Sequence, residues 1–309
     1  MRKLQLNPFV SKTVFVFGTA NTVTVGIEHR KVMEEVKDIL LSFHKCMSIY
    51  ESTSEISSLN HMAGSSSLSI SPEIYDLIRR SVAYSKLTNG AFDITALPLK
   101  KIWQTAEQIP TEAQIHHAKK LVNYRNIVFS DNKIMLKYSG MGVDLGGIAK
   151  GFAVDKITEL LKSRGIASGV INFGGSVFVL GEERSVGIQT PFGKKGRYIG
   201  TIRVKNKAVV TSGAYENYRV INGTAYQHIL NPHTGYPVNN ELLAVTLIGA
   251  KAEELDALAT GVCVMGIQKG YDLLKKRQID AIFIKKDGSV LLTEGIKESF
   301  SFKEATYEA

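Results

Sequence analysis

Cysteines and long apolar runs are scarce in this sequence, and both shortages narrow the classes of protein to which the chain can belong. Cys46 and Cys263 are its only cysteines and belong to no C-x-x-C or other metal-type spacing. Neither a disulfide framework nor a thiolate metal site is therefore predicted, and we expect two buried, inert thiols. No segment approaches the roughly 18 consecutive apolar residues of a membrane span. The apolar stretch at residues 14–17 is too short for a signal peptide, so we expect a cytoplasmic protein.

Basic residues outnumber acidic ones, but they are not clustered in the sequence as they would be in a nucleic-acid-binding segment. Lysines and arginines number 38 against 29 acidic residues, a net charge of +9, which suits a nucleic acid, an anionic surface or an anionic small substrate. The basic residues are dispersed beside acidic ones, and no aromatic–basic stripe accompanies them. We therefore predict no nucleic-acid partner.

The hydrophobic pattern predicts an α+β protein, because apolar residues recur at helical spacing in some segments and alternate in others. We expect a strand pair turning near 18–21, helices at 30–47, at 72–89, from 111, from the turn at 140–147 to 164 and at 251–276, a hairpin at 127–136, short strands through 168–249, a last hairpin at 282–292, and a loop at 51–71. Neither a repeat nor a linker interrupts the chain. We expect one domain over residues 10–300 made of two closely joined lobes, with terminal extensions at 1–9 and 301–309.

Three glycine-containing segments follow strand-like runs. Asp144-Leu-Gly-Gly-Ile-Ala-Lys-Gly151 opens a helix, where glycine permits close backbone approach, free N–H groups face a phosphate, and Lys150 adds a positive charge. The same segment would also suit a tight turn with a surface lysine. Asn172-Phe-Gly-Gly175 and Thr211-Ser-Gly213 present a similar choice between contact with a nucleotide diphosphate and an ordinary turn.

Asp256 and Thr260 indicate a cation site. They are four residues apart in a helical pattern and project from the same face. A carboxylate and a hydroxyl are ligands that Mg²⁺ takes together with waters and substrate phosphate. Alternatively, the Thr260 hydroxyl would bond to the carbonyl of Asp256 within the helix.

Two histidines are candidates for a general base. His228 ends a strand-like run and begins a turn-rich loop that reaches Pro237. An imidazole there can accept a hydroxyl proton near neutral pH. His233, inside the turn, is the second candidate, and a structural hydrogen-bonding role is the alternative for both.

Together and in this order, these motifs resemble the ApbE family, the FAD:protein FMN transferases. The resemblance spans about residues 14–293 and also includes Gly18-Thr19, residues 48–60, Gly90-Ala-Phe-Asp-Ile-Thr95 and Asp155. It implies an α+β fold related to the T-fold, with mixed sheets, packed helices and FAD held in a cleft between two lobes. Phe17 departs from the methionine, and Asn231 from the aspartate, that are common at these positions.

The resemblance also implies site residues and a reaction. Flavin and adenosine contacts would fall on Phe17, Tyr50, Ala91, Phe92, Asp93, Asp144 and Lys150, with further contacts around Ser212 and Leu230. Mg²⁺ would be held by the carbonyls of Gly147 and Ala259 together with Asp256 and Thr260. His228 or Asp256 would deprotonate a threonine in a flexible loop of an acceptor flavoprotein, and this threonine would take FMN from FAD and expel AMP. The alternatives are an FAD pyrophosphatase and a non-catalytic flavin-binding module.

Overall fold

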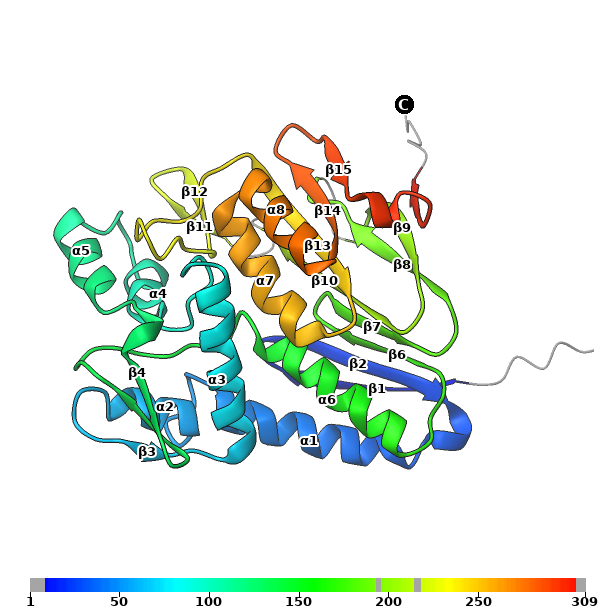
Figure 1. Ribbon diagram of the computed structural model, residues 1–309, viewed down its shortest axis with the longest axis horizontal. Helices are drawn as coiled ribbons and strands as arrows, with labels where there is room; N and C mark the ends of the chain where they lie inside the picture. Colours follow the sequence, from blue (N-terminus) through cyan, green and yellow to red (C-terminus); the bar gives the residue numbers. More distant parts are fainter. Residues whose placement is uncertain (1–8, 193–195, 214–217, 304–309) are drawn as a thin grey trace, which may run out of the picture.

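The computed structural model describes residues 9–192, 196–213 and 218–303. An eight-stranded antiparallel sheet forms its centre, in the order β1-β2-β6-β7-β10-β13-β14-β15. Its strands are β1 (Phe9–Val16), β2 (Thr19–Gly26), β6 (Gly169–Phe173), β7 (Ser176–Leu180), β10 (Lys207–Gly213), β13 (Leu242–Gly249), β14 (Asp280–Lys285) and β15 (Val290–Leu292). Helices cover one face of this sheet (Figure 1).

Alternation along the central strands divides the apolar side chains between two cores, because successive side chains point to opposite faces. On β7, Phe178 belongs to the larger core, whereas Val177 and Val179 belong to the smaller one. The larger core is covered by α1 (Val32–Met47), α6 (Ala149–Ser163), α7 (Ala252–Met265) and α8 (Ile267–Arg277). The smaller core is closed by a three-stranded sheet of β16 (Phe300–Phe302), β9 (Tyr198–Val204) and β8 (Arg184–Gln189).

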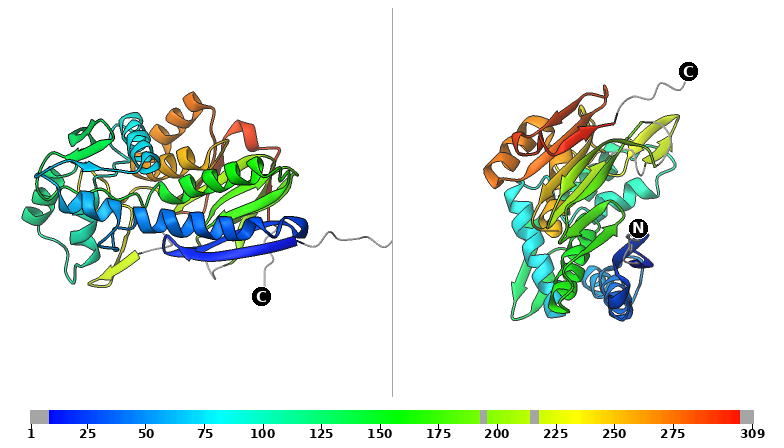
Figure 2. Two further views of the ribbon diagram at one scale, coloured as in Figure 1. Left: turned by 90° about the horizontal axis from the view of Figure 1, so that it is seen from below. Right: turned by 90° about the vertical axis from the view of Figure 1, so that its right-hand side faces the viewer.

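The second lobe lies beside one end of the large sheet (Figures 1 and 2). It consists of α2 (Glu55–His61), α3 (Pro72–Leu87), α4 (Leu97–Gln104), α5 (Glu112–Lys120) and a small sheet of β3 (Leu68–Ser69), β5 (Lys133–Leu136) and β4 (Ile127–Ser130). Ile74 of this lobe and Ile171 of β6 belong to the same buried cluster. The two lobes therefore share a core, and the α+β fold expected from the sequence is confirmed.

Short elements complete the fold. They are the hairpin of β11 (Tyr218–Ile221) and β12 (Thr224–Gln227), and the 3₁₀ helices at Ile27–His29, Tyr124–Asn126 and Glu294–Ile296. The hairpin packs through Ile221 against Trp103 of α4 and Ile115 of α5.

Most predicted elements are present, and the misses have local causes. The loop predicted at 51–71 contains α2. Its N-cap residue is Ser54, whose hydroxyl oxygen accepts a hydrogen bond from Ser57 N at 2.8 Å. Helix α4 was not predicted. The single helix predicted at 251–276 is two helices, because Gly266 has a φ of 79° and ends α7. The domain bounds at residues 10 and 300 stay predictions, and residues 1–8 and 304–309 lie outside the described part.

Both thiols are poor nucleophiles. Burial raises the pKa of Cys263 to about 12 and is the main cause that raises the pKa of Cys46 to about 11. Cys46 is only half-buried, contrary to expectation. Within the described residues, no helix has the length and apolar content that crossing a bilayer requires.

Candidate active site

Helices α6 and α7 meet at a glycine. A Cβ on Gly151 would lie 2.2 Å from the carbonyl oxygen of Ala252 and 2.8 Å from Cβ of Asp256, so only glycine permits this approach. Gly151 N donates a 2.9 Å hydrogen bond to Oδ2 of Asp256, whose side chain is almost fully buried. The ammonium of Lys150 lies 3.6 Å from Oδ1 of the same carboxylate. The predicted residues Lys150 and Asp256 are therefore brought together.

Thr260 lies one turn further along the same face of α7, and Gly147, in the turn before α6, lies against it. The Thr260 hydroxyl donates a 3.3 Å hydrogen bond to the carbonyl of Asp256, which is the intrahelical alternative considered for this pair. A Cβ on Gly147 would lie 3.3 Å from Oγ1 of Thr260 and 3.2 Å from the ring of Phe92. The turn that carries Gly147 thus passes directly over Thr260, and a hydroxyl that donates one bond keeps lone pairs for a cation.

The donor atoms around Asp256 are of the kind that Mg²⁺ takes. They comprise one buried carboxylate, the Thr260 hydroxyl and the adjacent backbone of Gly147. Within the described part of the chain, no group of three or more His, Cys, Asp or Glu side chains could hold a metal. A cation here would depend on neutral oxygens, water and substrate phosphate, as Mg²⁺ sites often do. Ala259 has only a methyl side chain, so its backbone carbonyl is the one group that it could contribute.

Asp144 is held by a lysine that sequence reasoning missed. Lys100 of α4 lies 2.5 Å from Oδ2 of Asp144, and Gly146 N donates to Oδ1 at 2.9 Å. A proline at the first turn of α4, followed by Leu99 and Trp103 four residues apart, is the signal that could have revealed this helix. Lys100 therefore fixes the beginning of the glycine turn.

The loop after α3 carries three predicted residues, of which Ala91 and Phe92 are buried and Asp93 is partly buried. The side chains of Ala91 and Phe92 are buried, so Ala91 would contact a ligand through its backbone. Asp93 accepts hydrogen bonds from Thr95 N, Thr95 Oγ1 and Tyr124 N at 2.8, 2.7 and 3.0 Å. Burial raises the pKa of Asp93 and outweighs these hydrogen bonds. In this structure Asp93 organises the loop.

Three predicted flavin contacts have partners other than Asp256 and Thr260, and a fourth, Tyr50, is exposed. The backbone N–H of Phe17 donates to Nδ1 of His44 at 3.4 Å, and the two rings meet edge to face. Tyr50 is 76% exposed. The carbonyl of Ser212 accepts from the Cys263 thiol at 3.6 Å, and Leu230 forms an isolated bridge with Pro237. Their role as flavin contacts therefore stays a prediction.

The two histidines differ in their surroundings. His228 is exposed directly after β12. His233 is also exposed, and its ring would lie 3.3 Å from a Cβ on Gly90. The charge of His233 acts on Asp93, lowering its pKa against the larger effect of burial. Asn231, one of the two departures from the family pattern, accepts a hydrogen bond from His233 N at 2.9 Å and so shapes the turn.

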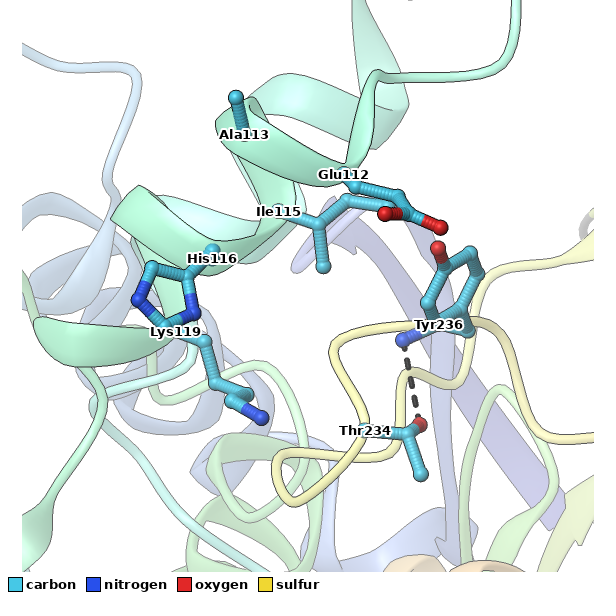
Figure 3. Close-up of a pocket in the computed structure, with 7 residues that line it drawn as sticks. All are labelled: Glu112, Ala113, Ile115, His116, Lys119, Thr234 and Tyr236. Carbon is cyan, nitrogen blue, oxygen red and sulfur yellow. Dashed lines mark hydrogen bonds between the residues drawn. The ribbon is translucent and has the colours of Figure 1, made fainter.

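Two cavities involve the loop that follows β12. One of 420 Å³ lies between α5 and the loop that follows β12, and His116, Lys119 and Tyr236 line it (Figure 3). A neighbouring cavity of 340 Å³ is lined by residues of the same loop and by Val264 of α7. None of the predicted contact residues lines either cavity, so the predicted flavin contacts remain proposals.

Comparison with known proteins gives a consistent result. A model of the ApbE family matches residues 17–283. The chain is 29% identical over 308 residues to an FAD:protein FMN transferase of Klebsiella pneumoniae, covering 98% of this chain and 97% of the relative. It is 30% identical over 298 residues to one of Vibrio cholerae, covering 93% and 86%.

Solved structures share the fold. An ApbE protein from Thermotoga maritima superposes with a TM-score of 0.88 at 28% identity, covering 94% of this chain and 99% of that one. The flavin transferase ApbE from Vibrio cholerae, at 24% identity, has a TM-score of 0.84 and covers 94% and 99%. The latter comparison supports the fold alone.

Proposed function

The chain belongs to the ApbE family, and from this premise we propose that it uses Mg²⁺ to transfer the FMN moiety of FAD to a threonine of an acceptor flavoprotein. The curated relatives compared above are FAD:protein FMN transferases. The observation that most supports this proposal is that the turn carrying Gly147 packs against Asp256 and Thr260 of α7. Lys150 lies beside the carboxylate of Asp256. These groups combine oxygen donors for a cation with positive charge for a diphosphate.

The transfer is a displacement at phosphorus. The acceptor hydroxyl oxygen forms a bond to the FMN-side phosphorus, the bond from that phosphorus to the bridging oxygen breaks, and AMP departs with the bridging oxygen. The hydroxyl proton passes to a base. The products are AMP and a flavin joined to the acceptor by a phosphoester.

Residues of the chain would bind and orient the diphosphate. In the turn at 144–151, the N–H groups of Gly146, Ile148, Ala149 and Gly151 already donate within the protein. We therefore assign the contact with the phosphate charge to Lys150, which adds a point charge. Held by Asp256, Thr260 and the carbonyls of Gly147 and Ala259, Mg²⁺ would neutralise negative charge on the phosphate oxygens. Gly151 N holds Oδ2 of Asp256, which leaves Oδ1 directed toward the Lys150 side.

His228 is the base that we favour. It is exposed at the end of β12, where an incoming loop can reach it. Asp256, the other candidate, is almost fully buried and already accepts a hydrogen bond from Gly151. A buried carboxylate that helps to hold a cation is a weaker proton acceptor than an exposed imidazole.

The decisive experiment mixes the protein with FAD, Mg²⁺ and an acceptor flavoprotein subunit that presents a threonine in a flexible loop. We expect stoichiometric AMP and a covalently fluorescent acceptor band, both abolished by EDTA. The matched control replaces the acceptor threonine with valine. AMP and free FMN without labelling would instead identify an FAD pyrophosphatase, and FAD binding without AMP would identify a flavin-binding module.

The cytoplasmic location stays a prediction that cell fractionation can test.

A further inference from the structure

Helix α7, which carries Asp256 and Thr260, begins without a cap of its own. Its N-cap residue is Lys251, whose side chain accepts no hydrogen bond. The first N–H groups of a helix have no partner within it and need an acceptor. Here that acceptor is Asp155 of α6, whose two carboxylate oxygens take hydrogen bonds from Ala252 N at 2.9 Å and Glu253 N at 3.0 Å.

Asp155 and Gly151 hold α7 at two points one turn apart. They are four residues apart on α6 and face the same way. Gly151 N binds the carboxylate of Asp256, and Asp155 binds the backbone at Ala252, four residues before Asp256. A helix held at two successive turns along one face can neither slide along nor rotate against its neighbour without breaking one of these contacts.

We propose that Asp155 is a positioning residue for the cation site. By fixing the first turn of α7, it sets the rotation of that helix and so directs Asp256 and Thr260 toward Gly147. This inference rests on the proposed function, because it assigns Asp155 to the Mg²⁺ site described there. Groups that orient metal ligands commonly affect metal affinity about 10- to 100-fold.

A separate anchor makes the inference testable without unfolding the protein. Glu253, in the same first turn, receives two hydrogen bonds from Arg80 of α3 at 2.7 and 2.8 Å. This contact pulls the turn toward α3 and does not involve Asp155. We therefore expect α7 to stay folded and docked without the Asp155 carboxylate, but with a less sharply defined rotation.

The test measures cation affinity directly. Mn²⁺ is titrated into the protein with FAD present and no acceptor, and free Mn²⁺ is followed by electron paramagnetic resonance. We expect Asp155→Ala to weaken binding about 10- to 100-fold. Asp155→Asn should also weaken binding, because its amide keeps one acceptor oxygen but turns an NH2 donor toward the second backbone N–H. At saturating Mg²⁺, kcat should stay within about threefold while the KM for Mg²⁺ rises in the same order.

The matched control is Thr111→Ala, which removes the cap of α5, a helix outside the proposed machinery. It should lower thermal stability and leave the Mn²⁺ dissociation constant unchanged. If both Asp155 variants also lose stability with an unchanged dissociation constant, Asp155 is merely structural and the inference is wrong. If the unchanged protein neither binds Mn²⁺ nor labels an acceptor, the proposed function itself fails, which is a different result.

Discussion

Gly151 and Asp256 are joined by a 2.9 Å hydrogen bond from the backbone N–H of one to Oδ2 of the other. The contact joins the start of the glycine-rich helix to the carboxylate of the candidate cation site. It exists only because the missing side chain lets α6 approach α7 closely. Substitutions on either side of this bond therefore test the site from both helices.

Gly151→Ala should impair both stability and cation binding. The added methyl group would lie 2.2 Å from the carbonyl oxygen of Ala252, so the helices must separate. Overpacking of this kind costs about 1–3 kcal/mol of unfolding free energy, measurable by urea denaturation. Gly187→Ala is the control, since its nearest neighbouring atom would be 3.7 Å away. Equal stability of the two variants would contradict the close helix contact.

Asp256→Asn should abolish transfer. The amide keeps the shape of the side chain but removes the negative charge that would bind the cation, so we expect at least about a 10³-fold loss of kcat/KM, equivalent to about 4 kcal/mol. AMP release at several Mg²⁺ concentrations measures it. Asp272→Asn, an exposed aspartate on α8, should leave the rate unchanged. Full activity of Asp256→Asn would refute the assignment of the cation site.

Much of the fold could be predicted because its signals are local. The capping box of Thr111 and Gln114 is present as expected, and so is the turn at Asp131 and Asn132, which both have positive φ. Helix α2 was missed because its apolar residues are few and its seven residues fit within a polar segment. Such short helices depend on tertiary packing more than on their own sequence pattern.

The site could be predicted only in part. That Asp256 and Thr260 share one face of a helix could be predicted, because side chains four residues apart in a helix project from the same side. Lys100 and Asp155 could not be assigned roles from spacing, because their partners are 44 and 97 residues away in sequence. Contacts of this range are set by how helices pack against each other. The exposed position of Tyr50 likewise depends on packing rather than on local pattern.

Asp155 should make stability depend on pH. Burial raises its pKa from 3.8 to about 6, with Glu253 adding to the rise and Lys251 opposing it. Because the folded pKa lies above the unfolded one, the folded state binds more protons, and the free energy of unfolding contributed by Asp155 falls as pH rises from about 4 to about 6. The loss should be about 1–3 kcal/mol.

Urea denaturation of the unchanged protein and of Asp155→Asn at pH 4.5 and pH 7 measures this contribution. The difference in unfolding free energy between the two proteins should change with pH, since the amide does not titrate. Asp272→Asn serves as the exposed control and should follow the unchanged protein at both values. A difference that stays constant between pH 4.5 and pH 7 would show that the folded pKa of Asp155 is ordinary.

Lys100→Met should weaken FAD binding. It removes the partner of Asp144 and leaves a largely buried carboxylate without its ion pair, which costs about 1–2 kcal/mol. The glycine turn would lose its fixed start, and we expect the KM for FAD to rise about tenfold with a smaller change in kcat. Lys101→Met, on the same helix and exposed, is the control. Identical KM values for the two variants would exclude a role for Lys100.

His228→Gln should remove the proton acceptor while keeping a polar side chain. General-base catalysis contributes about 10²- to 10⁴-fold, so we expect kcat to fall by that factor and the acidic limb of the pH–rate profile to disappear. The affinity for FAD, measured by fluorescence quenching, should change little because the imidazole would act on the acceptor. His61→Gln, at the exposed end of α2, should keep both the rate and the profile. An unaltered acidic limb in His228→Gln, with the rate reduced, would assign His228 to acceptor binding and return the role of base to Asp256.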